Sequence, residues 1–173
     1  VAVGEAQGWK LVSAIDGVVR TVEIDAPLSD AWTDYLVGVV RELRTIRAAP
    51  RGALVAVAST VPIGAGLSSS AAIAVAATRA LSALAGRRLD AARVVDVAAR
   101  AEHEQVGVRG GRMDQAIAVY GKRHAGLLYE TGTGAMRQVP MAHRVWVIET
   151  GVSHRLAGGQ LNRRRSECEA ALA

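Results

Sequence analysis

The chain has 173 residues, which is enough for one domain or for one domain and part of a second. Half of its residues are hydrophobic, and because it has no Phe, three Trp and three Tyr, we expect a core built mainly from alanine and valine. The net charge is +5, from 21 Lys and Arg against 16 Asp and Glu, but no aromatic side chains are interleaved with the arginines, so we expect no nucleic-acid partner.

Hairpin, helix and strand patterns follow one another through the first 60 residues. Apolar and polar residues alternate over Trp9–Ile24 around Asp16-Gly17, which is typical of a β-hairpin. A helix is predicted over residues 30–46, where apolar side chains recur at helical spacing: Trp32, Tyr35, Leu36, Val39, Val40, Leu43 and Ile46. The chain breaks at residues 50–52, and Ala53–Thr60 is then typical of a strand.

The rest of the chain predicts further helices and strands. A helix over residues 68–85 is apolar nearly all round, so we expect it to be buried, and Gly86 suits its C-terminal end. Helices are also predicted over Asp90–Val106, over Met113–Tyr120 and from Gln160, and strands over Ala125–Tyr129, Met136–Val139 and Arg144–Glu149. Because strands form hairpins and helices come in pairs, we expect an α+β fold.

The cysteine content and the apolar runs bear on location. The single cysteine, Cys168, excludes an internal disulfide framework and fits a reducing compartment. The longest apolar run, Ala71–Ala77, is far shorter than the roughly 20 residues that a membrane helix needs. We expect no secretory leader, because no charged and then apolar stretch with a small-residue cleavage site stands at the start of these residues. We therefore expect a cytoplasmic protein without a membrane partner.

A glycine- and serine-rich segment, residues 62–72, links the predicted strand to the buried helix. Gly64 and Gly66 let the backbone turn tightly, and Ser68, Ser69 and Ser70 stand at the start of a helix, where N–H groups are unpaired. Such a terminus binds anions, for example nucleotide phosphates. The segment lacks the lysine of a Walker loop and the third glycine of a dinucleotide fingerprint. The alternative is an ordinary turn with serines as helix caps, and the residues alone leave both open.

Two carboxylates further along also have two interpretations each. Glu102 lies on the apolar side of its predicted helix, where it either pairs with a cation such as Arg100 or Arg109, or ligates magnesium. Asp114 stands at the start of a helix, where it is either an ordinary first-turn acid or a base positioned for a substrate hydroxyl.

Taken together, these segments resemble the GHMP small-molecule kinases, and among them the galactokinases. The matching motifs are Trp32-x-x-Tyr35-x-x-Gly38-Val39; Pro62-x-x-x-Gly66-Leu67-x-Ser69-Ser70-Ala71; Ala101-Glu102-His103 with Gly107 and Gly111-x-Met113-Asp114-Gln115; and His154 with Leu156-Ala157 followed by Asn162-x-Arg164-Arg165-x-x-Cys168-Glu169. They occur in the family's order and span most of the chain.

The resemblance implies ATP and Mg²⁺ as cofactors and a sugar as substrate. It assigns the phosphates of ATP to the turn, that is to Pro62, Gly64, Ala65, Gly66, Leu67, Ser68, Ser69 and Ser70. It makes Ser70 and Glu102 the ligands of Mg²⁺. It makes Asp114 the catalytic residue that orients or deprotonates the anomeric hydroxyl, and it places Gly111 beside Asp114 in the sugar site.

The same resemblance implies the domain organisation. Residues 1–150 correspond to the N-terminal ATP-binding domain of the family, with the ribosomal protein S5 domain 2-like fold, without its first strand. Residues 151–173 correspond to the start of the C-terminal domain. We expect a fragment, inactive by itself, because the family's Gly-Glu-His-Thr-Asp block and C-terminal glycine-rich motif are not in this sequence. A monomer is favoured.

Departures from the family pattern affect the expected acceptor. Leu161 stands where the family usually has a tyrosine that contacts the sugar, Arg112 replaces a hydrophobic residue, and Gly110 stands where a cysteine is frequent. We therefore expect an ATP-dependent sugar 1-kinase of galactokinase type. The alternatives are a GHMP kinase for another acceptor, of the arabinose, homoserine or mevalonate type, and a non-catalytic galactokinase-like sensor of sugar or ATP.

Overall fold

The protein structure is a computed structural model that describes residues 1–29, 31–107, 110–148 and 160–172. The N-terminal part forms a four-stranded sheet in the order β1-β4-β2-β3, from β1 (Ala2–Glu5), β2 (Trp9–Ser13), β3 (Val19–Val22) and β4 (Ala53–Val57). β2 and β4 run parallel, and the other neighbours are antiparallel. The predicted hairpin and the strand after residue 52 are confirmed. β1 has no signal in the sequence because it contains a single large apolar residue, Val3.

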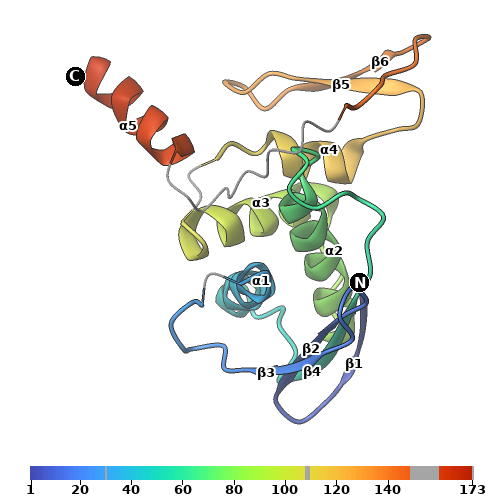
Figure 1. The fold of residues 1–173 in the computed structure, drawn as a ribbon, viewed down its shortest axis with the longest axis vertical. Coiled ribbons are helices and arrows are strands. Elements are labelled where there is room, and N and C mark those ends of the chain that lie inside the picture. The colour runs from blue at the N-terminus through green and yellow to red at the C-terminus, as the bar shows by residue number, and fades with distance from the viewer. Residues whose placement is uncertain (30, 108–109, 149–159, 173) are drawn as a thin grey trace.

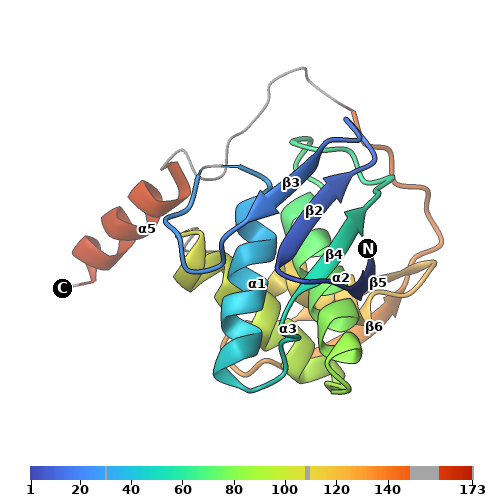
Figure 2. The same ribbon diagram turned by 90° about the horizontal axis from the view of Figure 1, so that it is seen from below.

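Helices cover one face of this sheet. α1 (Thr33–Thr45) and α2 (Ser69–Leu84) lie behind the strands in Figure 2, and α3 (Ala91–Arg100) packs against both helices. The side chains of β2 alternate accordingly, since Trp9 and Leu11 are buried whereas Lys10 is exposed. The core between the two layers includes Leu36, Val40, Val55 and Leu81. This confirms the α+β class.

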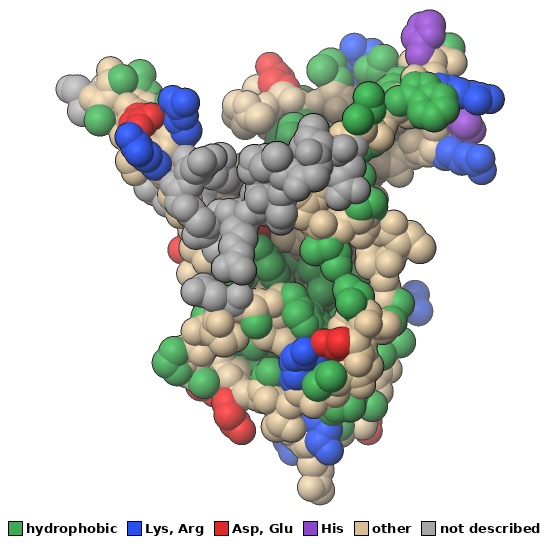
Figure 3. Space-filling view, viewed as in Figure 1, with side chains coloured by type: hydrophobic (Ala, Val, Ile, Leu, Met, Phe, Trp, Pro, Cys, Tyr) green, Lys and Arg blue, Asp and Glu red, His purple; other side chains and the backbone are tan. Residues whose placement is uncertain are grey.

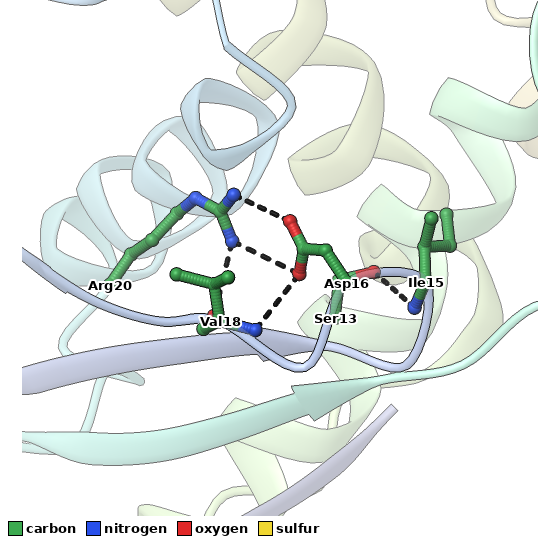
Figure 4. Close-up of polar contacts among 5 residues, drawn as sticks. All are labelled: Ser13, Ile15, Asp16, Val18 and Arg20. Atoms are coloured by element: carbon green, nitrogen blue, oxygen red, sulfur yellow. Dashed lines mark hydrogen bonds and ion pairs between the residues drawn. The ribbon is translucent and has the colours of Figure 1, made fainter.

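The connection between β2 and β3 is longer than a two-residue turn and holds a local polar cluster (Figure 4). The Asp16 carboxylate accepts hydrogen bonds from the Val18 N–H at 3.0 Å and from the Arg20 guanidinium at 2.6 Å. These hydrogen bonds lower the pKa of Asp16, with the Arg20 contact as the larger cause. Arg20 also lies over the Trp32 ring, 5.8 Å from its centroid, and so links the hairpin to the segment that leads into α1.

The two helices after the serine-rich turn differ in how well the sequence predicts them. α2 agrees with the prediction, and Gly86, just beyond its end, adopts a positive φ of 69°. α3 begins as predicted, because the Asp90 side chain accepts a hydrogen bond from the Arg93 N–H at 2.7 Å. A continuous α-helix to Val106 is wrong, however. Residues Ala101–Gln105 form a π-helical turn, η1, which is closed by a 3.2 Å bond from the Val106 N–H to the Ala101 carbonyl.

The remaining elements lie on the other side of the helices from the large sheet (Figure 1). α4 (Met113–Tyr120) leads into a two-stranded sheet of β5 (Ala125–Tyr129) and β6 (Met136–Pro140), and α5 (Gln160–Ala171) ends the described chain. No helix among these or the other described residues is long and apolar enough to span a membrane. The boundary expected at residue 150 lies among residues 149–159, outside the described part, so the two-domain division stays a prediction.

The strand predicted over Arg144–Glu149 is wrong for residues 144–148, which form no strand; Glu149 lies outside the described residues. Val145, Trp146 and Ile148 expose 70%, 80% and 85% of their surface. A β-strand requires a neighbouring strand with which its backbone forms hydrogen bonds, and no strand in the described residues pairs with this segment. In this region, at the upper right of Figure 3, hydrophobic side chains therefore lie on the surface among basic and His side chains.

Gly52 tests how tightly the start of β4 packs. A Cβ atom at Gly52 would lie 2.5 Å from the Gly8 carbonyl oxygen and 2.6 Å from that of Ala6, both backbone atoms. We expect Gly52→Ala to lower the free energy of unfolding by about 2 kcal/mol, measured by urea denaturation. Gly4→Ala is the matched control in the same sheet, since its Cβ would meet nothing within 4 Å. Equal stabilities of the two variants would contradict this view of the packing.

Candidate phosphate and metal site

The glycine- and serine-rich turn is an exposed loop between β4 and α2. Gly64 and Gly66 both have φ of 74°, in the left-handed region that glycine adopts without strain. Ser68 precedes the first helical residue and is itself left-handed, and its side chain makes no capping hydrogen bond. The capping alternative is therefore wrong for Ser68. Among the predicted phosphate-binding residues, Pro62, Gly66 and Leu67 are exposed, Gly64, Ala65, Ser68 and Ser69 are half-buried, and Ser70 is buried.

A buried carboxylate faces this helix start. Glu102, in η1, is only 8% exposed, and its carboxylate lies near enough to the hydroxyl of Ser70, in the first turn of α2, for that side chain to lower its pKa. The carboxylate accepts a hydrogen bond of 2.5 Å from Nε2 of Gln115, in the first turn of α4. The structure therefore brings together Ser70 and Glu102, the two predicted Mg²⁺ ligands, which are more than 30 residues apart in the sequence and lie on two different helical segments.

The electrostatics of this cluster are unfavourable for a lone carboxylate. Burial raises the pKa of Glu102, the negative charge of Asp114 raises it further, and the hydrogen bonds from Ser70 and Gln115 oppose the rise. The pKa of Tyr35, on α1, is raised by burial and then by the charges of Glu102 and Asp34. Four helical segments thus converge on one carboxylate, with a second carboxylate near enough to repel it.

One of the two cations proposed as partners for Glu102 pairs with another carboxylate. Arg100 instead forms an ion pair with Glu42, with 2.9 Å between Nε and Oε2, and Arg109 lies outside the described residues. None of the ion pairs in the described part of the chain involves Glu102. The arginine-paired interpretation is thus wrong for Arg100, because this side chain belongs to a different carboxylate.

The donor set fits a hard divalent cation. A hydroxyl and a carboxylate are oxygen donors of the kind that Mg²⁺ prefers, and Mg²⁺ in phosphoryl-transfer sites takes its remaining ligands from phosphates and water. Oε1 of Gln115 is buried without a hydrogen-bond partner among the described residues, so a further oxygen acceptor lies in the same cluster. The described residues hold no group of three His, Cys, Asp or Glu side chains that could hold a metal ion by themselves.

The other predicted site residues lie around the start of α4. Asp114 is half-buried in the first turn of α4, and Gly111 is exposed, with open space where a Cβ would lie. Arg112 forms an ion pair of 2.8 Å with Asp96 of α3, which ties the start of α4 to that helix. Asn162 of α5 donates a hydrogen bond of 2.8 Å to the Gly107 carbonyl. His154, Leu156 and Ala157, and the side chain of Leu161, lie outside what the structure describes.

Sequence reasoning missed the polar residues that support the cluster. Gln115 is fully buried, yet in the sequence it is only part of a motif without an assigned role. Glu42 is 3% exposed and belongs to the helix predicted over residues 30–46. Glu42 stands among Val39, Val40 and Leu43 on the apolar side of that helix, and this position in the sequence could have indicated that it is buried.

The fold and this geometry define a class of α+β proteins in which a glycine- and serine-rich turn at a helix start faces a buried carboxylate. The chain belongs to the GHMP kinase family, since the family model "GHMP kinases N terminal domain" matches residues 34–122, half of the chain. The match contains the serine-rich turn, Glu102 and Asp114.

Individual relatives agree with this assignment. The chain is 39% identical over 163 residues to the galactokinase of Thermotoga maritima, covering 91% of this chain and 46% of the relative. It is 41% identical over 143 residues to the galactokinase of Chloroflexus aurantiacus, covering 82% and 37%. The chain thus spans less than half the length of these curated relatives.

Solved structures support the fold. Galactokinase of Lactococcus lactis, complexed with galactose, matches 98% of this chain and 47% of its own chain with a TM-score of 0.82 at 21% identity. Mevalonate kinase of Methanococcus jannaschii matches 68% and 40% with a TM-score of 0.60 at 17% identity. Both place the chain in the fold of the GHMP kinase N-terminal domain.

The buried charge of Glu102 gives a testable dependence of stability on pH. Because the pKa is raised in the fold, ionisation of Glu102 costs stability as the pH rises above the ordinary glutamate value of 4.5. In EDTA, we expect Glu102→Gln to equal the wild type in stability below that pH and to exceed it at pH 7. Urea unfolding across this pH range measures the difference. A wild type that is more stable than the variant at pH 7 without metal would contradict the assignment.

Proposed function

We propose that this chain is the MgATP-binding part of an ATP-dependent sugar 1-kinase of galactokinase type. The observation that supports it most is the convergence of Ser70, Glu102 and Asp114 around the uncapped start of α2. Galactokinases at 39% and 41% identity favour galactose or a related sugar over the other acceptors of the family. Arg112, a departure from the family pattern, is paired with Asp96, so it gives no support to a different acceptor.

The turn and the helix start would bind the phosphates of ATP. Left-handed glycines at positions 64 and 66 leave backbone N–H groups accessible, and the first turn of α2 adds unpaired donors and the positive end of the helix dipole. Ser70 and Glu102 would hold Mg²⁺. The bound ion would neutralise charge on the phosphates during transfer.

The carboxylates of Glu102 and Asp114 differ in exposure, and this difference supports a different role for each. Glu102 is buried and bonded to Ser70 and Gln115, so it is suited to a fixed metal site. Asp114 is half-buried at the start of α4 and is free to meet a substrate. Asp114 accepts the proton of the anomeric hydroxyl, whose oxygen attacks the γ-phosphorus while the bond to the bridging oxygen of ADP breaks. Gly111, which leaves open space at the same loop, would line the sugar site.

Replacement of Asp114 distinguishes between a catalytic kinase and a non-catalytic sensor. In the complete protein we expect Asp114→Ala to lower kcat by about a hundredfold or more, since a positioned base is worth that much. Sugar-dependent ADP release, assayed over a panel of galactose, arabinose, homoserine and mevalonate, measures both the rate and the acceptor. Asp25→Asn is the control, because Asp25 is an exposed partner of Arg44 on the surface.

Two outcomes would contradict the proposal. Unchanged turnover in Asp114→Ala would remove this residue from the mechanism. Nucleotide binding without turnover, for every acceptor in the panel, would favour the non-catalytic sensor.

The 173-residue chain alone should not turn over ATP in response to sugar. It spans less than half of the galactokinase relatives, and the family's Gly-Glu-His-Thr-Asp block is not in its sequence. We expect ADP release at the no-sugar background with galactose present, while the chain retains its far-UV circular dichroism. Sugar-dependent turnover by this chain would show that these residues suffice. The division at residue 150 and the cytoplasmic location stay predictions.

A further inference from the structure

The π turn that contains Glu102 departs from regular helix geometry. It spans Ala101–Gln105 at the end of α3, and its i→i+5 bond runs from the Val106 N–H to the Ala101 carbonyl. Such turns are rare, and they persist where the surrounding structure stabilises them. Glu102 is the second residue of this turn, so the geometry of the turn decides where its carboxylate lies.

A buried carboxylate on α1 bridges the two ends of this turn. Glu42 is 3% exposed, its Oε2 accepts a hydrogen bond of 2.9 Å from Nε of Arg100, and its Oε1 accepts one of 2.8 Å from Nε2 of Gln105. Residues five apart in an α-helix are about 140° apart around the axis, because each residue turns about 100°. In a π turn they come to the same side. One carboxylate binding both residues 100 and 105 therefore favours the π turn over the α-helix.

The backbone of α1 also contacts the π turn, at a position four residues before Glu42. A Cβ atom at Gly38 would lie 3.0 Å from the Ala101 carbonyl oxygen and 3.1 Å from Cβ of Gln105, so only glycine allows this close approach without a shift. The side-chain oxygen of Gln105 is also held, by the Arg41 guanidinium at 3.5 Å, and Arg41 is fixed by a 2.7 Å bond to the Ile24 carbonyl. The first and last residues of the turn are thus both pressed against α1.

We propose that Glu42 and Gly38 are positioning residues, which hold the π turn in the form that presents Glu102 to Ser70 and to the metal. The proposal rests on the proposed function, because it takes Glu102 as a ligand of Mg²⁺. Glu42 and Gly38 share one face of α1 with Tyr35, at spacings of three and four residues, and the whole face lies against η1. If the turn relaxes to an α-helix, the rotation per residue changes and the Glu102 carboxylate moves away from Ser70.

The test compares nucleotide binding with and without metal in the 173-residue chain. Isothermal titration calorimetry gives the Kd of AMP-PNP, a non-hydrolysable ATP analogue, in Mg²⁺ and in EDTA. We expect Glu42→Gln to reduce the strengthening by Mg²⁺ about tenfold, as loss of a residue that orients a metal ligand does. The Kd in EDTA should stay unchanged, because the glycine- and serine-rich turn is untouched. Gly38→Ala should act in the same direction, and Glu102→Gln should abolish the Mg²⁺ effect.

The controls separate failure of this inference from failure of the proposed function. Arg44→Ala lies on the same helix, in an exposed pair with Asp25, and should leave both Kd values unchanged. If the wild type binds AMP-PNP no better in Mg²⁺ than in EDTA, the proposed function fails and this inference fails with it. If the wild type responds to Mg²⁺ and the folded Glu42→Gln and Gly38→Ala variants respond equally, only the positioning role is overturned. If the circular dichroism spectrum shows that Glu42→Gln does not fold, the response of Gly38→Ala to Mg²⁺ decides by the same criterion.

Discussion

The structure depends on the burial of a carboxylate where four helical segments meet. Glu102 lies 8% exposed between the first turn of α2, the first turn of α4 and the face of α1. A buried carboxylate without a cation is costly, and a neighbouring carboxylate raises that cost. Among the described residues, Ser70 and Gln115 compensate the charge of Glu102, and the charge of Asp114 opposes them.

Local patterns in the sequence were sufficient for most of the fold. The alternation around Asp16-Gly17, the helical spacing that ends at Ile46 and the apolar helix after the serines all give the elements that the structure has. Each of these depends on a period of two or of 3.6 residues, which the sequence displays directly. The failures have a different cause. The π turn depends on Glu42, almost 60 residues away, and the segment 144–148 has a strand-like sequence but no pairing partner in the described residues.

The site was less predictable than the fold, for the same reason. From the residues alone, an arginine partner was the favoured interpretation of Glu102, and an ordinary helix start that of Asp114. Only the family resemblance linked Ser70 to Glu102, and the proximity of the two side chains in the structure supports that link. Residues that act through others, such as Glu42 and Gln115, have no signature in a single sequence, because their partners become neighbours only after folding.

A comparison of the three buried carboxylates in the described residues shows why Glu102 differs. Asp34 accepts hydrogen bonds from Ser29 and Ala31, including two backbone N–H groups, at the start of α1. Glu42 has the guanidinium of Arg100 and the amide of Gln105. The charges of both carboxylates are therefore compensated by groups of the protein: that of Asp34 by backbone N–H groups at a helix start, and that of Glu42 by a cation.

Among the described residues, the donors to Glu102 are the neutral side chains of Ser70 and Gln115, and Asp114 is a neighbour of the same charge. A carboxylate with a structural role is expected to be fully compensated in the fold, as Asp34 and Glu42 are. A carboxylate left under-compensated among the described residues, beside accessible backbone donors, is instead a candidate functional residue. The oxygen donors around it and the adjacent loop suited to phosphates are the features that the proposed binding of magnesium with a nucleotide would use.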